Sequence, residues 1–154
     1  MPPRTSTLLR AALAGAASGS RSQAVLAACV LTRPGSTRLD RWLHRPSVRR
    51  SVLYGAAGEL VGDKLPVAPS RTEPPGLGAR LALGAATAGL LATRRGERPA
   101  LPAVVGLLAA AGTTFAGPPA RAAAAARFGS DLPGALTEDV LAVGLAAAAT
   151  RTGR

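Results

Sequence analysis

Tyr54-Gly-Ala-Ala-Gly-Glu-Leu-Val-Gly-Asp-Lys-Leu-Pro66 is the stretch around which the rest of the chain can be arranged. It predicts an apolar, glycine-spaced helix that carries Glu59, Asp63 and Lys64 and ends at Pro66. Because Glu59 and Asp63 are four residues apart, a helix places both carboxylates on one face, one turn apart. The glycines near that face would let a second helix approach the acidic pair. The other segments are therefore interpreted by what they could bring to this pair.

The composition is closer to that of a membrane bundle than to that of a water-soluble domain. The 154 residues predict a single domain, and only 3% of them are aromatic, so large packing residues are scarce. Small residues make a poor core in water, where buried apolar area drives folding, but they suit lipid, where helices associate by close contact. A mean hydropathy of +0.22 is low for a membrane protein. A soluble, alanine-rich helical protein therefore stays open as an alternative.

The net charge of +11 would fit nucleic-acid binding, but the distribution of that charge does not. All the basic residues except Lys64 are arginine, and most of them lie between apolar runs, in residues 33–50 and 94–98. Arginines that flank membrane segments are distributed in this way. We therefore expect the lipid bilayer, and no nucleic acid, as the partner.

The single cysteine and the single histidine limit the chemistry of any site. Cys29 lies in an apolar run and is expected to be a small buried residue, whereas His44 lies in an arginine-rich stretch and is expected to be solvated or interfacial. One cysteine and one histidine form neither a disulfide nor a Cys/His metal site, and there is no nucleophile–base set or phosphate-binding glycine loop. The sequence thus predicts no enzyme, no metal site and no cofactor.

The apolar segments predict an all-α, small multi-helix integral membrane bundle with about four spanning helices and a first helix that is interrupted or re-entrant. That first segment, residues 7–32, is apolar at both ends and polar in the middle, where Arg21 stands. A signal peptide is the less favoured interpretation because the apolar core of this region is short. The expected spanning helices are residues 51–65, 77–93, 101–117 and 132–150. Residues 51–65 fall short of the roughly 20 residues that a crossing needs, and we expect Pro118-Pro119 to break or kink the helix that begins at residue 101.

Several arginines could meet the acidic pair. At its depth in the first segment, Arg21 would either face protein, with Glu59 or Asp63 as its partner, or reach the headgroups, and the two alternatives are equally supported. Arg80 has the same two alternatives, while Arg71, in a proline-rich connection, is more simply a solvated charge. The candidate polar membrane site therefore comprises Glu59, Asp63, Lys64, Arg21, Arg71 and Arg80.

A secondary acidic group lies at the start of the last expected helix. Asp131 is well placed as an N-cap, and Glu138 and Asp139 follow in the early turns, where carboxylates are favourable against the helix dipole. Ordinary capping explains these three acids better than a ligand site does.

The connections carry most of their arginines in residues 33–50, residues 94–98 and the C-terminal tail. The positive-inside rule therefore predicts a multi-pass protein of the plasma membrane with residues 33–50 and the C-terminus in the cytoplasm. If the first segment is re-entrant, both ends of the chain are cytoplasmic.

Most of the chain resembles a known family. The similar parts are Gly58-Glu-Leu-Val-Gly-Asp-Lys-Leu-Pro66, Pro69-Ser-Arg71 with Pro74-Pro75 and Arg80, and Asp131-Leu-Pro-Gly-Ala-Leu-Thr-Glu-Asp139. They are similar to the bacterial integral-membrane family called domain of unknown function 4126, and the most specific part is Glu59-x-x-x-Asp63-Lys64-x-Pro66. The resemblance implies a small multi-helix membrane protein with no established activity. It marks Glu59, Asp63, Lys64 and Pro66 as the candidate site.

Two functions are compatible with these features. The first is a structural or accessory membrane protein, in which Glu59, Asp63, Lys64 and the arginines form a static buried network that fixes the helix packing. The alternative is a small transporter or permeation subunit that binds a cation or proton at Glu59 and Asp63. Helix faces made of small residues are also compatible with a homo-oligomer of undefined size.

Overall fold

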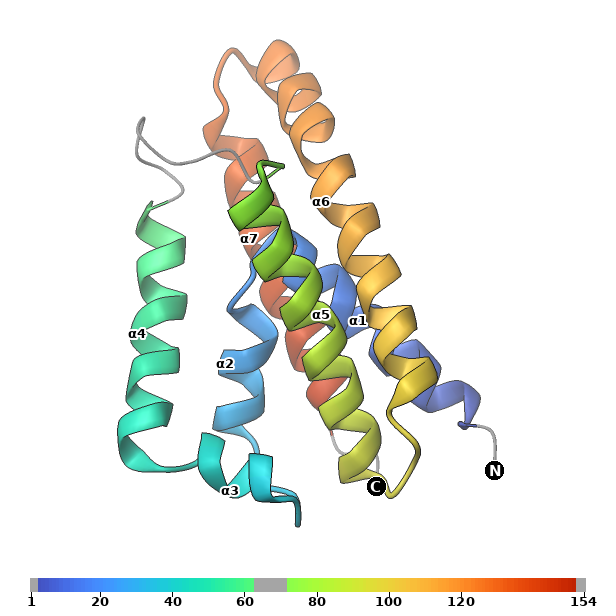
Figure 1. The fold of residues 1–154 in the computed structure, drawn as a ribbon. Coiled ribbons are helices and arrows are strands. Elements are labelled where there is room, and N and C mark those ends of the chain that lie inside the picture. Colours follow the sequence, from blue (N-terminus) through green and yellow to red (C-terminus); the bar gives the residue numbers. More distant parts are fainter. Residues whose placement is uncertain (1–2, 63–71, 152–154) are drawn as a thin grey trace.

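The computed structural model describes residues 3–62 and 72–151, so Asp63, Lys64 and Arg71 lie outside the described residues. The described part of the chain forms seven α-helices and no strand, as predicted (Figure 1). The helices are α1 Thr5–Ser20, α2 Ala24–Leu31, α3 Arg38–Leu43, α4 Pro46–Gly62, α5 Pro74–Arg94, α6 Ala100–Phe128 and α7 Leu132–Thr150.

Within the described ranges, three helices are long and apolar enough to cross a membrane, namely α5, α6 and α7. The prediction of about four was wrong because the helix expected at residues 51–65 does not qualify. That helix, α4, begins earlier, at Pro46, and its 17 residues include Arg49 and Arg50. It is about 25 Å long at the rise of an α-helix, which is less than the roughly 30 Å of a bilayer's hydrocarbon core.

The first apolar segment is interrupted at Arg21, as predicted. α1 ends where Arg21 takes an extended conformation, with φ −136° and ψ 108°, and α2 begins at Ala24. In Figure 1, α1 rises from the N-terminus and α2 returns toward α3. The N-terminus, α3, the connection between α5 and α6, and the C-terminus therefore lie at the same end of the bundle (Figure 1).

The helices α1, α5 and α6 pack through glycine and alanine. Gly15 of α1 faces the backbone of Gly106 in α6. A Cβ atom added at Gly84 of α5 would lie 2.7 Å from the Cβ of Ala110, and one added at Gly106 would lie 2.5 Å from the Cβ of Ala88. These backbones therefore approach more closely than larger side chains would allow.

Many large apolar side chains of α6 and α7 point outward. Leu108 and Phe115 of α6 are 63% and 55% exposed, and Val140 of α7 is 72% exposed. In contrast, Gly106, Ala110 and other small residues of these helices are buried. This arrangement of small residues inside and large apolar residues outside suits a helix bundle whose surroundings are lipid.

Pro118 and Pro119 do not break α6, which continues without interruption to Phe128 and ends at Gly129 in the left-handed conformation, with φ 69°. Of the expected break or kink at these prolines, the break was wrong. Proline withdraws a backbone donor but fixes φ near the helical value. A run of alanines follows the prolines, and alanine has the highest helix propensity of all residues. This run sustains the helix beyond the prolines.

Candidate functional site

Glu59 lies near the end of α4, and its carboxylate binds the turn that separates α1 from α2. The backbone N–H groups of Ser22 and Gln23 donate to it at 2.8 and 2.9 Å, and the hydroxyl of Ser22 donates at 2.9 Å. The first N–H groups of a helix have no partner within the helix. Gln23 is the N-cap residue of α2, so the carboxylate of Glu59, which reaches over from a different helix, satisfies the N–H at the start of α2 and that of Ser22 before it and holds the interruption in place.

Arg80 of α5 approaches the same carboxylate. One of its terminal nitrogens lies 3.4 Å from Oε1 of Glu59 and donates to the backbone oxygen of Ser20, also at 3.4 Å. Arg80 is only 6% exposed. Of the two alternatives for Arg80, the structure has the pairing with an acid and not the extension to headgroups. Arg80 thus bridges the end of α1 and the carboxylate that caps α2.

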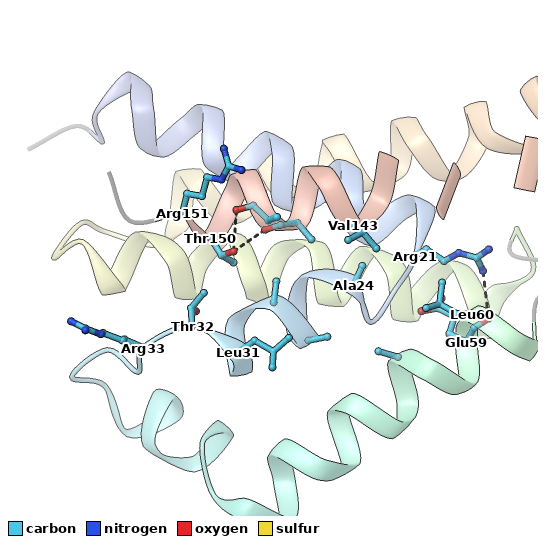
Figure 2. A pocket seen from close by; sticks show the side chains of 15 residues that line it. Arg21, Ala24, Leu31, Thr32, Arg33, Glu59, Leu60, Val143, Thr150 and Arg151 are labelled. Carbon is cyan, nitrogen blue, oxygen red and sulfur yellow. Dashed lines mark hydrogen bonds between the residues drawn. The ribbon is translucent and has the colours of Figure 1, made fainter. Parts of the chain in front are cut away.

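Arg21 also faces protein, and it pairs with a carboxylate that the sequence did not predict as its partner. The side chain is 2% exposed, and its Nε donates to Oδ1 of Asp139 at 2.6 Å as part of an ion pair. A terminal nitrogen donates to the backbone oxygen of Glu59 at 3.5 Å (Figure 2). Asp139 of α7 is therefore a carboxylate partner of Arg21, Glu59 meets Arg21 through its backbone oxygen, and Asp63 lies outside the described residues.

The network thus gathers Arg21, Glu59, Arg80 and Asp139 from the α1–α2 turn and from α4, α5 and α7. Asp63, Lys64 and Arg71 belonged to the same predicted site, and their placement lies outside the described residues.

The other two late acids form a separate group with Arg121 of α6. Asp131 precedes α7, as predicted, but its side chain makes no capping hydrogen bond. It accepts instead from Nε of Arg121 at 3.0 Å, and Glu138 lies 3.8 Å from the same guanidinium. Helix capping, the expected role of these carboxylates and of Asp139, is replaced by pairing with arginines.

Sequence reasoning missed a second buried ion pair, which joins Asp40 of α3 to Arg94 at the end of α5. Asp40 is 0% exposed, and its Oδ1 accepts from Nε of Arg94 at 2.8 Å. Arg94 also donates to the hydroxyl of Thr32 at 3.0 Å and to the backbone oxygen of Cys29 at 3.1 Å. This pair therefore ties the arginine-rich connection of residues 33–50 to the bundle. A sequence signal existed, because Thr37-x-x-Asp40 resembles a helix-capping pattern, and the Thr37 hydroxyl accepts from the Asp40 N–H at 3.1 Å.

His44 is bonded within the protein, contrary to the expectation of a solvated or interfacial ring. Its Nδ1 lies 2.8 Å from the backbone oxygen of Asp40, and its Nε2 lies 2.9 Å from that of Thr32. Both neighbours are acceptors, so a neutral ring donates to one of them and only a doubly protonated ring donates to both. His44 links α3 to the end of α2.

A groove of about 1010 Å³ follows α2, between α4 and α7 (Figure 2). Arg21 and Glu59 lie at its inner end, and Arg33 and Arg151 at its outer end. Its walls are mostly alanine, leucine and valine. The described residues contain no group of three or more His, Cys, Asp or Glu side chains that could hold a metal ion.

Comparison of this chain with family models, with curated proteins and with solved structures finds no match. The class of the protein therefore rests on the fold itself, which is all-helical in the described ranges, with three helices there that suggest a multi-pass membrane protein. The resemblance to domain of unknown function 4126 stays a prediction.

Proposed function

We propose that this chain is a structural or accessory integral membrane protein in which buried ion pairs hold an interrupted helix inside the bilayer. The observation that carries the proposal is the environment of Glu59. Its carboxylate accepts hydrogen bonds from two backbone N–H groups and one hydroxyl, and it lies beside Arg80. A carboxylate whose oxygens are engaged by the protein on this scale acts as a structural cap.

The same geometry gives less support to a transporter or permeation subunit. A cation at Glu59 would have to displace the donors of Ser22 and Gln23, and a proton or cation at Asp139 would have to displace Arg21. Each displacement leaves a buried polar group or charge without its partner, and the free energy lost in this way exceeds the free energy gained from the bound ion.

A membrane location is supported by the outward-facing leucine, valine and phenylalanine side chains of α6 and α7. The bundle end that carries both termini also carries the arginines of residues 33–50 and 94–98 (Figure 1). By the positive-inside rule, this end is the cytoplasmic one. The α1–α2 pair then enters and leaves the bilayer from the cytoplasmic side.

The test compares wild-type protein, Glu59→Gln and the control Glu73→Gln in sealed vesicles. Glu73 is exposed, and its side chain makes no capping bond to α5. The structural role predicts that Glu59→Gln lowers the yield of folded protein. It also predicts that vesicles containing the wild-type protein show no more cation or proton flux than empty vesicles. A flux in the wild type that Glu59→Gln abolishes at an unchanged folded yield would replace the structural role by transport.

A further inference from the structure

The groove along α2 has the dimensions and walls of a ligand site. Its volume of about 1010 Å³ stands at the upper end of the roughly 300–1,000 Å³ that such sites usually occupy. Ala24, Ala28 and Leu31 of α2 line it on one side, and Val143 and Ala147 of α7 line it on another. Leu31 and Val143 are 62% and 55% exposed. The groove thus presents an elongated apolar surface that the described part of the chain leaves uncovered.

The two ends of the groove differ in charge. At the outer end stand Arg33 and Arg151, and neither forms an ion pair with the described residues (Figure 2). Arg10 donates to the backbone oxygens of Ala149 and Arg151, which places a third guanidinium near this end. The one acid of the lining, Glu59, lies at the inner end and is engaged by the α1–α2 turn. The outer end therefore suits an anion.

Helix α4, which forms the third wall, contains no fully buried residue. Near its C-terminal end, α4 is attached to the bundle through Glu59, and closer to its start Val48, Val52 and Leu53 make apolar contacts with the core. Ala56 and Leu60 of α4 face the groove, and so does α7. An apolar occupant between α4 and α7 would supply the packing that α4 otherwise lacks.

We propose that the groove binds one acyl chain of an anionic phospholipid, with the phosphate at Arg33 and Arg151 and the chain along α2 toward Arg21. Guanidinium groups bind phosphate through paired, charge-assisted hydrogen bonds. The acyl chains of the bilayer are as apolar as the walls of the groove, so an acyl chain gains little free energy when it moves from the bilayer into the groove. The charge of the headgroup therefore decides which lipid is bound. The proposal rests on the membrane location proposed above.

The test uses the full-length protein in neutral detergent, titrated with phosphatidylglycerol or with phosphatidylcholine of the same acyl chains. Native mass spectrometry counts the lipids retained on each chain. We expect one tightly retained phosphatidylglycerol and weaker retention of phosphatidylcholine. Arg33→Gln combined with Arg151→Gln should weaken phosphatidylglycerol binding roughly 25-fold, at about five-fold for each juxtamembrane arginine, and leave phosphatidylcholine unchanged.

Two further variants locate the lipid. Arg38→Gln combined with Arg45→Gln removes the same charge from exposed arginines of the same connection, outside the groove lining, and should change binding less than two-fold. Ala147→Phe fills the groove from an exposed position of α7 and should reduce the retention of both lipids. Three results would each overturn the proposal. They are equal retention of the two lipids by the wild type, an equal loss of phosphatidylglycerol binding in the two double-arginine variants, and unchanged lipid retention in Ala147→Phe.

A second copy of the chain is the competing occupant. In a Cys29→Ser background, a cysteine substituted at Ala147 would form disulfide-linked dimers across the groove if a second copy filled it, and that result would also overturn the lipid proposal. Alkaline carbonate extraction of membranes separates this failure from that of the proposed function. A wild-type chain that stays in the pellet but retains no anionic lipid refutes the groove alone, whereas a chain that is released refutes the membrane role itself.

Discussion

Removal of the Glu59 carboxylate tests whether the interruption between α1 and α2 is held by a side chain. In Glu59→Ala, the backbone N–H groups of Ser22 and Gln23 lose the acceptor that they now reach at 2.8 and 2.9 Å. Alanine has the higher helix propensity, so the variant does not weaken α4 itself. Any loss of stability therefore comes from the contacts of the carboxylate.

The expected loss is about 2–4 kcal/mol. An unsatisfied buried polar group costs about 1–3 kcal/mol, and the lower half of that range applies to Ser22 and Gln23 because both are half-buried. Arg80 adds a smaller amount, since its contact with Glu59 is long, at 3.4 Å, and it keeps the backbone oxygen of Ser20. Glu59→Gln keeps one acceptor oxygen and should lose about half as much.

The assay is equilibrium unfolding of the protein in mild detergent by added sodium dodecyl sulfate, followed by far-ultraviolet circular dichroism. Glu73→Ala is the matched control, because Glu73 is exposed and its side chain caps nothing. We expect this control within about 0.5 kcal/mol of the wild type. The account of the interruption is refuted if Glu59→Ala is as stable as Glu73→Ala.

Two further variants test the rest of the packing by the same unfolding measurement. Arg94→Ala leaves the carboxylate of Asp40 buried without its ion-pair partner, so it should lower the free energy of unfolding by about 3–5 kcal/mol. Its exposed neighbour Arg95 is the control, and Arg95→Ala should change the free energy of unfolding little. Equal effects of the two variants would show that the ion pair has no structural role. Gly106→Ala places a methyl group 2.5 Å from a backbone oxygen of α5 and should lower the free energy of unfolding and the folded yield, whereas Gly112→Ala enters open space and should be neutral or stabilising; a neutral Gly106→Ala would show that α5 and α6 do not pack as closely as described.

The sequence predicts those features of the fold that depend on neighbouring residues. The all-helical class follows from the apolar runs, and the interruption at Arg21 follows from the polar residues that divide the first run. Arg21, Glu59 and Arg80 could be chosen for the site because an ionisable side chain within an apolar segment needs a partner. All three are engaged in the structure.

The features that were missed depend on how distant segments pack. Asp139 is 118 residues from Arg21, and Arg94 is 54 residues from Asp40, so no local pattern joins either pair. Helix dipole arguments favoured capping by Asp139, but a buried arginine nearby provides the stronger interaction. Pro118 was missed for a different, local reason, because a propensity rule for one residue was overridden by the alanine-rich helix around it.

The most direct test of the central claim, a membrane bundle whose first segment enters and returns on one side, is cysteine accessibility in sealed vesicles. Single cysteines at Ser6, Ser36 and Ser130 are introduced into the Cys29→Ser chain and labelled in intact sealed vesicles, and a separate membrane sample is washed with alkaline carbonate to test retention in the pellet. The account predicts retention in the pellet, labelling of positions 6 and 36 from the same side, and labelling of position 130 from the opposite side. Release into the supernatant, or positions 6 and 36 on opposite sides, would contradict it.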